Sequence, residues 1–405
     1  MAVKGNMIIG QSGGPTVVIN QTLIGAIEEA LKHEEIENIY GMRHGIQGLL
    51  DEQIVDLKKE SKETLEKVAN TPGAALGSCR YKPTREDCEK VFEICKKYNI
   101  RYFFYIGGND TAESSEILNS IAQQEGYDLH VFHLPKTIDN DLRETDHCPG
   151  YGSAAKYVAM LFMGDNMDNL SLKGIKINIV MGRNAGWLTA ASALARQKEG
   201  DGPHLIYVPE RPVTLEKIVE DIDKVYSKYG RAVVAVSEGL RNINGELMLK
   251  SGIKEVDAYG NIQLSGTGAL GDFLASYVRE KLSEKYNKKI RVRADTLGYA
   301  QRSFPGVSSM VDKKEAREVG QAGVKFAIQG HLSGSVIIKR TGTGSDYNVE
   351  YDIVDLKKVA RVTKPLLDEY IASDGNDVTD EFIKYAKPLV GELPEMARLN
   401  FYPVK

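Results

Sequence analysis

Short apolar runs alternate with amphipathic stretches along the whole chain. The apolar runs predict strands at residues 7–9, 102–106, 129–133, 175–181, 205–208, 232–237 and 290–294. The amphipathic stretches predict helices at residues 16–31, 85–97, 153–163, 188–196, 215–229, 271–286 and 313–328. Strands that alternate with helices are typical of α/β proteins, in which helices cover mostly parallel sheets. The pattern therefore predicts an α/β fold.

Glycine-rich turns follow several of the predicted strands. They lie at residues 10–14, 107–110, 181–186 and 238–239, and we expect them to open helices. In an open parallel sheet, ligands bind beyond the carboxyl ends of the strands. Four such turns on one chain predict a single cleft to which two sheets contribute.

Chain length and net charge indicate the number of domains and argue against one class of protein. The chain has 405 residues, more than one hydrophobic core usually holds, so we expect two or three domains. The formal net charge of −4 argues against a nucleic-acid carrier, which would normally have a basic surplus. The polar stretch at residues 341–346 and the tail from Pro388 are interpreted as surface connections.

The amino terminus and the cysteines bear on location. Residues 1–7 run directly into the first strand without a charged leader and a long apolar core, so a secretory signal is not expected. No stretch approaches the roughly 20 apolar residues that span a bilayer. The four cysteines form no C-x-x-C pair, and Cys88 and Cys95 share one face of a predicted helix, which indicates buried free thiols. We expect a reduced, cytoplasmic protein with no membrane partner.

The turn at residues 9–15 joins a predicted strand to a predicted helix. Its glycines let backbone N–H groups approach an anion closely, and the helix start adds partial positive charge. A phosphate site and a simple tight turn both fit this pattern. The turn is not a P-loop, because no Lys-Ser/Thr pair follows at the required spacing.

A formal G-x-G-x-x-G pattern occurs at residues 266–271. It follows the polar stretch 259–265, and the residue twenty positions after Gly271 is Arg291 instead of an acid. We interpret the pattern as a chance match or the entry to a helix, and not as a dinucleotide site.

Residues 134–141 combine a lysine with two carboxylates just after a predicted strand. If this segment is extended, Asp139 and Asp141 point to the same side. Phosphoryl transfer to an alcohol needs a base, neutralisation of the transferring group and in-line positioning. Asp139, Asp141 and Lys136 would supply the base and the cation. The structural alternative is a turn held by Asx hydrogen bonds.

Six motifs, in order along the chain, resemble those of the phosphofructokinases and of their pyrophosphate-dependent branch in particular. They are Gly13-Gly14, Gly77-Ser-Cys-Arg80, Gly107-Gly-Asn-Asp110, Lys136-Thr-Ile-Asp-Asn-Asp141, Met181-Gly-Arg183 and Leu297-Gly-Tyr-Ala-Gln-Arg302. The resemblance implies two Rossmann-like three-layer domains with mostly parallel sheets and an active site in the cleft between them. It implies a phosphoryl-donor domain at residues 1–150 plus about 300–340 and a sugar-phosphate domain at residues 151–299, with residues 341–405 packing on both.

The resemblance also implies roles for single residues. Asp139 would be the base that accepts the proton of the C1 hydroxyl of fructose 6-phosphate, with Asp141 assisting and orienting a metal. Arg183 would stabilise charge in the transition state. The sugar phosphate would contact Thr137, Ile138, Asp139, Met181, Gly182, Arg183, Glu238, Arg293, Tyr299 and Arg302. Its 6-phosphate would be held by Arg293, Tyr299 and Arg302. The phosphoryl donor would contact Gly13, Gly14, Arg80, Gly108, Asp110 and Lys136.

Several of these assignments have structural alternatives. Arg293 could be a solvated charge at a strand end, Glu238 a helix cap, and Tyr299 a ring at the edge of the core. Asp110 could cap a helix that starts near Thr111, because Asp is a favoured N-cap residue.

Two residues bear on the identity of the donor. ATP-using members of the family have glycine at the positions of Asp110 and Lys136. The carboxylate of Asp110 would occupy the volume, and repel the charge, of the α-phosphate of ATP. Lys136 would place a compact cation near a terminal phosphate of pyrophosphate. Both residues favour pyrophosphate over ATP.

The chain departs from the family pattern at two positions. The usual metal-binding aspartate is Asn109, whose amide oxygen brings no charge, so a weaker contact or an intervening water is expected. Asp141 is the other candidate ligand. An arginine that reaches a neighbouring subunit in bacterial ATP-dependent relatives is Gly174 here, with Lys173 and Lys176 as candidate substitutes.

The resemblance therefore implies a reversible, magnesium-dependent enzyme that transfers a phosphoryl group from pyrophosphate to fructose 6-phosphate, as a homodimer or homotetramer, in glycolysis and gluconeogenesis. An ATP-dependent phosphofructokinase and a sedoheptulose 7-phosphate kinase are the alternatives within the family. A regulatory subunit would be expected to have lost Asp139 and Asp141. A nicotinamide-dependent oxidoreductase would need a buried strand before Gly266.

Overall fold

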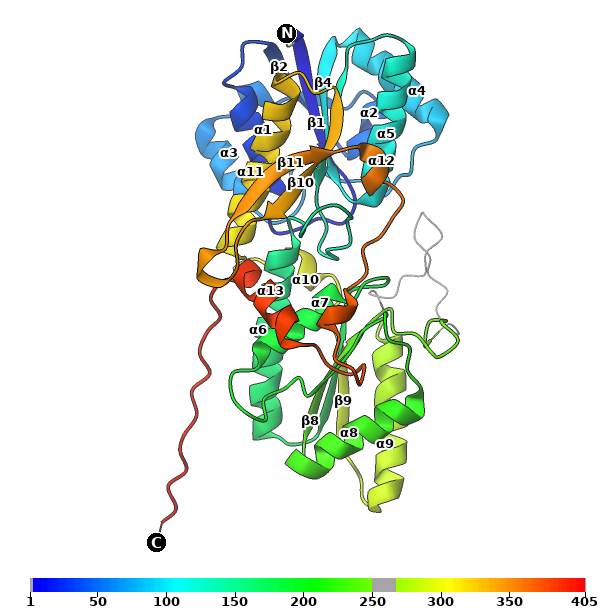
Figure 1. Ribbon diagram of the computed structural model, residues 1–405, viewed down its shortest axis with the longest axis vertical. Coiled ribbons are helices and arrows are strands. Elements are labelled where there is room, and N and C mark those ends of the chain that lie inside the picture. Colours follow the sequence, from blue (N-terminus) through cyan, green and yellow to red (C-terminus); the bar gives the residue numbers. More distant parts are fainter. Residues whose placement is uncertain (1–2, 250–266, 405) are drawn as a thin grey trace.

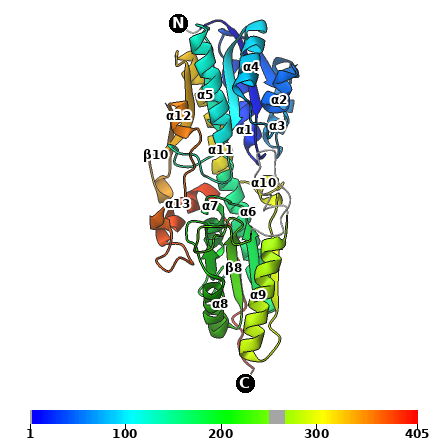
Figure 2. The same ribbon diagram turned by 90° about the vertical axis from the view of Figure 1, so that its right-hand side faces the viewer.

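The computed structural model describes residues 3–249 and 267–404. It has two lobes stacked along one long axis, each built on its own sheet (Figure 1). A view turned by 90° shows helices on both faces of these sheets (Figure 2). This arrangement confirms the predicted α/β class with mostly parallel sheets.

The first sheet has seven strands in the order β11-β10-β5-β4-β1-β2-β3. The strands are β1 (Gly5–Gln11), β2 (Ile36–Met42), β3 (Ile54–Asp56), β4 (Ile100–Gly107), β5 (His130–Pro135), β10 (Ser333–Arg340) and β11 (Val349–Val354). The five inner strands pair in parallel, and β3 and β11 are added antiparallel at the two edges. Parallel inner strands bring their carboxyl ends to one edge of the sheet, where ligands bind in such folds.

Helices cover both faces of this sheet. They are α1 (Ile19–Ala30), α2 (Gly45–Leu50), α3 (Lys62–Ala69), α4 (Arg85–Lys97), α5 (Asn109–Gln124), α11 (Met310–Ile328) and α12 (Leu356–Val359). Successive residues of β4 point to opposite faces, as the strand period requires. Phe104 therefore packs with α1 and α11, whereas Phe103 packs with α4 and α5. The result is a three-layer lobe with one core on each side of the sheet.

The second sheet has four parallel strands in the order β7-β8-β6-β9. The strands are β6 (Ile175–Val180), β7 (Leu205–Tyr207), β8 (Ala232–Ser237) and β9 (Val292–Thr296). The helices of this lobe are α6 (Tyr151–Ser171), α7 (Trp187–Ala190), α8 (Leu215–Tyr229), α9 (Ala269–Tyr286), α10 (Ala300–Ser303) and α13 (Asp380–Val390). Val234 of β8 packs with α8 and α9, while Val233 packs with α6, α7 and α13.

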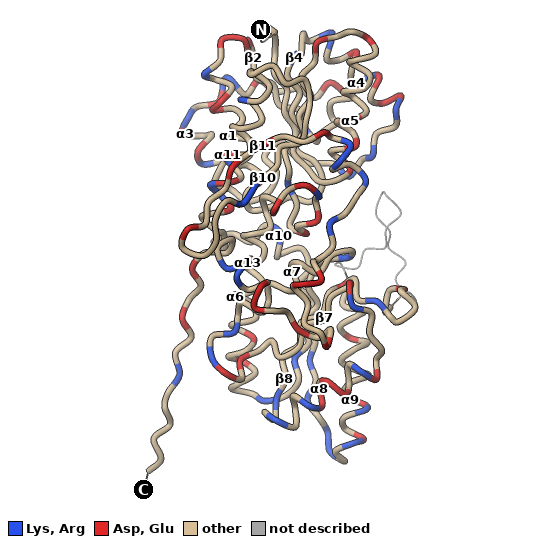
Figure 3. Tube along the Cα trace, viewed as in Figure 1, with Lys and Arg blue, Asp and Glu red and all other residues tan. Residues whose placement is uncertain are grey.

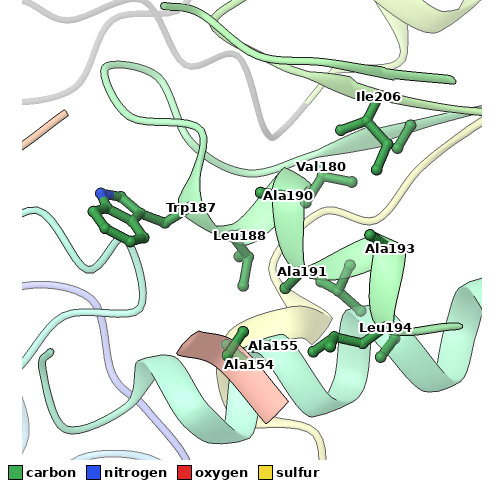
Figure 4. Packing of buried hydrophobic residues seen from close by; sticks show 14 of the residues in the cluster. Ala154, Ala155, Val180, Trp187, Leu188, Ala190, Ala191, Ala193, Leu194 and Ile206 are labelled. Atoms are coloured by element: carbon green, nitrogen blue, oxygen red, sulfur yellow. The ribbon is translucent and has the colours of Figure 1, made fainter. Parts of the chain in front are cut away.

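A short helical stretch after β6 closes the core beside the cleft. Here α7 continues into a 3-10 helix, η2 (Ala191–Ala195), and its apolar side chains face α6. Figure 4 shows Leu188 and Ala191 of this stretch opposite Ala154 and Ala155 of α6. Small residues on both sides allow the two backbones to approach closely, which fixes the turn that precedes Trp187 against the lobe.

The two lobes share a cap at the start of α6. This helix follows Gly150, which has no side chain with which to cap it. Asp312, near the start of α11, accepts hydrogen bonds from the backbone nitrogens of Gly150 (2.8 Å) and Ser153 (2.9 Å) instead. A buried carboxylate of one lobe thus satisfies and neutralises the amino terminus of the long helix of the other.

The segment after residue 340 is more integrated than a surface tail. β11 lies in the first sheet, and three further short elements follow β10, namely 3-10 helices η3 (Gly344–Asp346) and η4 (Asp368–Tyr370) and helix α12. Pro388 lies inside α13, where Leu389 and Val390 are buried, so the predicted surface connection begins only at residue 391; residues 391–404 have no helix or strand and are mostly exposed, as expected. Residues 341–346 are mostly exposed, as expected.

Other predictions from the sequence have clear outcomes. The predicted strand at 290–294 is shifted by two residues in β9, and the turn at 238–239 leads into a loop rather than a helix. The G-x-G-x-x-G pattern begins at Gly266, which lies outside the described residues together with 259–265, and Gly268 caps α9. All four cysteines are free and buried. In the described ranges, no helix has the length and apolarity needed to cross a membrane.

Candidate active site

A cavity of about 330 Å³ lies where the carboxyl ends of the two sheets meet. Its lining comes from turns of both lobes and consists of Ser12, Gly13, Gly14, Pro15, Arg80, Gly108, Asn109, Asp110, Thr111, Lys136, Thr137, Ile138, Asp139, Asp141, Met181, Arg183, Asn184, Glu238, Tyr299 and Arg302. Along both lobes, Lys and Arg are interspersed with Asp and Glu in the chain trace (Figure 3). The cavity gathers four basic side chains and four acidic ones in a small volume.

The turn after β1 forms one wall of the cavity. Gly13 has φ of +74°, which a residue with a side chain rarely adopts, and Ser78 fixes its carbonyl oxygen with a hydrogen bond of 2.6 Å. A Cβ on Gly14 would lie 2.6 Å from Nη1 of Arg302. The two glycines therefore allow cationic side chains to approach the backbone directly.

Lys136 extends from the end of β5 into this wall. Its ammonium donates a hydrogen bond of 2.8 Å to the carbonyl oxygen of Gly14, and the residue is only 4% exposed. Burial, together with the positive charge of Arg302, lowers the pKa of Lys136 to about 8. A buried ammonium with one neutral acceptor gains strongly from an anionic ligand in the cavity.

Asp139 and Asp141 lie in the Asp139 loop, defined here as residues 137–148. The loop is not extended as predicted, because Asn140 between them has φ of +54°. The side chain of Asn140 is buried and accepts a hydrogen bond of 3.0 Å from the nitrogen of Cys148. This kink turns Asn140 into the protein and leaves both carboxylates on the cavity side. The two carboxylates thus reach one cavity through a kinked backbone, and not through the extended one considered from the sequence.

The two carboxylates share an environment that disfavours two negative charges. Burial raises the pKa of Asp139, and burial together with the charge of Asp139 raises the pKa of Asp141. Lys136 and Arg302 oppose the shift at Asp139. Oδ1 of Asp139 is buried and has no hydrogen-bond partner among the described residues. A buried acceptor without a donor is costly, so this oxygen is suited to a proton-donating ligand.

Arg302, on α10, and Tyr299, just before this helix, form the part of the cavity wall next to Gly14. The guanidinium lies 4.4 Å from the centroid of the Tyr299 ring, a cation–π arrangement. Within residues 3–249 and 267–404, the Nε atom of Arg302 is buried without a hydrogen-bond partner. An arginine held in this way presents donors to an anionic group such as a phosphate. Tyr299 is 45% exposed, so it is not a ring at the edge of the core.

The turns after β6 and β8 support each other. Gly182 has φ of +139°, and its nitrogen donates to Oε1 of Glu238 at 3.4 Å. A Cβ on Gly239 would lie 2.0 Å from the backbone oxygen of Arg183, so a glycine is required at that contact. Glu238 follows a strand and precedes a loop, which excludes the alternative of a helix cap. The contacts place Arg183 and Glu238 on the same side of the cavity.

The turn after β4 carries Asn109 and Asp110. Helix α5 begins at Asn109 with Gly108 as its N-cap, so Asp110 lies in the first turn and is not the cap that the sequence suggested as an alternative. An amide nitrogen of Asn109 can donate to the backbone oxygens of Val359 (3.2 Å) and Val362 (3.1 Å). In that orientation, the amide oxygen of Asn109 faces Asp141 and lies 3.5 Å from Oδ2 of Asp141.

The pair Asn109 and Asp141 fits a magnesium site that a substrate completes. Mg²⁺ binds proteins through one or two oxygen ligands and takes the rest from water and phosphate. In the part of the chain that the structure describes, no group of three His, Cys, Asp or Glu residues could hold a metal. The protein therefore offers two oxygens here, one of them charged, and the donor would have to supply others.

The structure brings together all but two of the predicted site residues. Gly182 is not in the lining, although its neighbours Met181 and Arg183 are. Arg293 is exposed on the edge strand β9, away from the lining of this cavity, which favours the alternative of a solvated charge within one chain. Of the two candidate substitutes for the missing arginine near Gly174, Lys176 forms an ion pair with Asp295.

Sequence reasoning missed some residues around the cavity. Ser12, Pro15, Thr111 and Asn184 line it, and each lies inside or next to a motif that was singled out. The buried ring of His133 supports the turn after β4 through a hydrogen bond. Burial lowers its pKa to about 4, so the neutral ring donates from Nε2 to the carbonyl oxygen of Gly107 at 2.8 Å. Nothing in the spacing of the sequence indicated that contact.

Comparisons with known proteins agree with this geometry. A model of the family described as Phosphofructokinase matches residues 6–327. The chain is 48% identical over 400 residues to a Rhodospirillum rubrum protein named pyrophosphate–fructose 6-phosphate 1-phosphotransferase. The matched region covers 98% of this chain and 97% of the relative. It is also 34% identical to a sulfofructose kinase of Alkalicoccus urumqiensis over 367 residues, or 90% of this chain and 91% of the relative.

A solved structure shares the whole architecture. The pyrophosphate-dependent phosphofructokinase from Marinobacter aquaeolei superposes with a TM-score of 0.85 at 33% identity, covering 98% of this chain and 95% of that chain.

Proposed function

Because the chain belongs to the phosphofructokinase family, we propose that it transfers a phosphoryl group from pyrophosphate to the C1 hydroxyl of fructose 6-phosphate. One observation carries this function. Among the described residues, Asp139 has a buried carboxylate oxygen without a donor, and Arg302 has a buried guanidinium nitrogen without an acceptor. A substrate that has both a hydroxyl and a phosphate supplies both missing partners.

The reaction then follows from the groups in the cavity. Asp139 accepts the proton of the C1 hydroxyl while that oxygen forms a bond to the near phosphorus of pyrophosphate. The bond between this phosphorus and the bridging oxygen breaks, and phosphate leaves. Lys136 and Arg183 neutralise the charge that spreads over the transferring phosphoryl group. The products are fructose 1,6-bisphosphate and phosphate.

Asp139 and Asp141 share one buried site, so their protonation is linked. Two buried carboxylates at one site hold a proton between them more readily than two isolated ones. Burial raises the pKa of Asp139, but the nearby cations Lys136 and Arg302 favour its charged form, and we assign Asp139 as the base.

The two substrates occupy different walls. The sugar phosphate contacts Thr137, Ile138, Asp139, Met181, Gly182, Arg183, Glu238, Tyr299 and Arg302, and pyrophosphate contacts Gly13, Gly14, Arg80, Gly108, Asp110 and Lys136. Arg302 binds the 6-phosphate with its planar fork.

Pyrophosphate is the donor for two physical reasons. Asp110 projects a negative charge from the first turn of α5, where the α-phosphate of ATP would have to pass. Lys136 places its ammonium at the Gly13–Gly14 turn, which suits a short dianionic donor. Mg²⁺ arriving with the donor would be held by Asp141 and the amide oxygen of Asn109, and it would neutralise phosphate charge.

The proposed reaction has consequences for the metabolic role of the enzyme. Hydrolysis of pyrophosphate is less downhill than that of ATP, so the step is reversible and serves glycolysis and gluconeogenesis. The four buried thiols fit a reducing cytoplasm. A homodimer or homotetramer is expected, which sedimentation of the purified chain would establish.

Initial rates with matched donors test the function. Fructose 6-phosphate, sedoheptulose 7-phosphate and sulfofructose are each assayed with Mg²⁺ and either pyrophosphate or ATP. Turnover of fructose 6-phosphate with pyrophosphate alone supports the proposal. Turnover with ATP alone would overturn the roles of Asp110 and Lys136, and turnover of another acceptor alone would overturn the assignment of the sugar.

A further inference from the structure

The Asp139 loop rests on a segment that lies outside the region matched by the family model. That region ends at residue 327. Leu142 of the loop forms an antiparallel bridge with Thr363, and the backbone nitrogen of Lys364 donates to the carbonyl oxygen of Asp141 at 2.6 Å. A carboxylate of the cavity thus has its own peptide group bound by the carboxyl-terminal part of the chain.

Lys364 also binds the far side of the same loop with its side chain. Nζ donates to the backbone oxygens of Thr145 (2.9 Å) and Asp146 (2.8 Å). The ammonium lies 5.1 Å from the centroid of the Trp187 ring, and the indole nitrogen donates to the carbonyl oxygen of Lys364 at 3.2 Å. One lysine therefore joins the beginning and the end of the loop and is itself held by the start of α7 (Figure 4 shows Trp187 at that point).

Tyr385 of α13 makes a second connection to the loop. Its hydroxyl accepts a hydrogen bond of 2.9 Å from Asn140 and donates one of 3.0 Å to the backbone oxygen of Asp146. Asn140 is the residue whose positive φ sends Asp139 and Asp141 toward the cavity. Tyr385 thus binds the residue that sets the direction of both carboxylates.

We propose that Lys364 and Tyr385 are positioning residues for phosphoryl transfer, which hold the Asp139 loop in the one shape that directs Asp139 and Asp141 into the cavity. The inference rests on the proposed function for its kinetic consequence. Neither residue lines the cavity, so each acts through the loop.

The backbone of the loop explains why it needs these contacts. Asn140 and Glu144 both have positive φ, at +54° and +67°, and conformations of this kind persist only when the surroundings enforce them. The loop contains no helix or strand that could do so. Lys364 binds three backbone oxygens of the loop from the segment between α12 and η4, so a small shift of that segment would displace the base. Displacement of a reacting group by about 1 Å can cost roughly 100-fold in rate.

The test compares Lys364→Met, Lys364→Arg and Tyr385→Phe with the control Lys358→Met, which changes an exposed lysine on α12. Two quantities are measured on the full chain: the kinetic constants with fructose 6-phosphate and pyrophosphate, and the hydrogen exchange of amides in residues 137–148. Lys364→Met is expected to lower kcat by roughly 10- to 100-fold while both KM values stay within about threefold. Lys364→Arg keeps the charge and should recover most of kcat. The control should match the wild type.

Hydrogen exchange separates this inference from the proposed function. Lys364→Met and Tyr385→Phe should accelerate exchange in the Asp139 loop and leave the strands of both sheets unchanged. If the wild type shows no turnover with these substrates, the proposed function fails, while the exchange result still decides the positioning role. Unchanged exchange in the loop, or a kcat within about twofold of the wild type in Lys364→Met, would overturn the inference. Should Lys364→Met fail to fold, Tyr385→Phe, which removes a single oxygen, decides it.

Discussion

The ammonium group of Lys136 lies against the turn after β1 and donates a hydrogen bond of 2.8 Å to the carbonyl oxygen of Gly14. This contact joins the end of one inner strand to the turn that follows another. Gly13 is equally close, since a Cβ placed on it would lie 3.1 Å from the same nitrogen. The cation is therefore fixed at the backbone where a phosphate is expected, and it has little water to stabilise its charge.

Replacement of Lys136 by Met should weaken binding of pyrophosphate more than binding of the sugar. A charge-assisted hydrogen bond is worth about 1.5–3 kcal/mol, so KM for pyrophosphate should rise roughly 10- to 100-fold. The pKa of Lys136 is lowered to about 8, so the empty wild-type site loses this charge as the pH rises through 8. KM for pyrophosphate should therefore increase above pH 8 in the wild type and change less in Lys136→Met. A flat profile in the wild type would contradict the assignment.

Replacement of Asp139 by Asn should remove turnover and leave the sugar site formed. The amide has nearly the same shape but cannot accept the proton of the C1 hydroxyl, and loss of a general base costs about 10²- to 10⁴-fold in rate. Calorimetric titration should show fructose 6-phosphate binding within a few-fold of the wild type. Near-normal kcat in Asp139→Asn would remove the base assignment.

Asp110→Gly should admit ATP as a donor, alone or combined with Lys136→Gly. The change removes both the side-chain volume and the negative charge in the first turn of α5. The measurement is the ratio of kcat/KM for ATP to that for pyrophosphate, which should increase in Asp110→Gly. If ATP turnover stays undetectable in both variants, the choice of donor does not depend on these two side chains.

His147 should make the stability of the fold depend on pH above neutrality. Its ring lies between Oδ1 of Asp146 (2.7 Å) and Oε2 of Glu315 (2.6 Å). Burial opposes the charged ring, but the hydrogen bonds to Asp146 and Glu315 prevail and raise the pKa of His147 to about 9. The folded pKa is above the unfolded value of 6.5, so the contribution is complete below about pH 6.5 and is lost as the pH rises through 9.

Urea unfolding between pH 6.5 and 9.5 measures this effect. The linkage corresponds to roughly 3 kcal/mol of unfolding free energy for a shift of this size. His147→Gln should be less stable at pH 7, because the two carboxylates lose their cation, and its unfolding free energy should vary less over the same range. An equal slope in both proteins would show that another group titrates.

The sequence predicted the bounds of those elements in which apolar residues recur with one regular period. Helices α4 and α8 have the predicted bounds, because an apolar stripe and clear caps define both ends. Helix α5 was expected only from the turn that opens it and had no predicted bounds, since its buried face begins with Thr111, Ser114 and Ser115 and shows no apolar stripe there. Strand β3 at the edge of the sheet and its neighbour β2 were missed because strands with mixed exposure lack a continuous apolar run.

The site was predicted better than the fold around it. Side chains at the carboxyl ends of parallel strands converge for a topological reason, so motifs far apart in sequence could be placed in one cleft. The backbone of the Asp139 loop could not be predicted, because the positive φ of Asn140 depends on Tyr385, which is 245 residues away along the chain. Contacts of that kind leave no periodic signal.

The position of β10 has a consequence for how this enzyme could be divided. β10 lies beyond residue 327 but pairs with β5, and its Ser335 binds His133 beneath the cavity at 2.8 Å. A fragment cut at residue 327 would retain every side chain to which the chemistry is assigned. It would also expose the open edge of β5 to other chains, which invites aggregation. The smallest transplantable module is therefore larger than the set of catalytic motifs, and a chimaera between relatives should exchange the segment that follows residue 327 together with the loop that it holds.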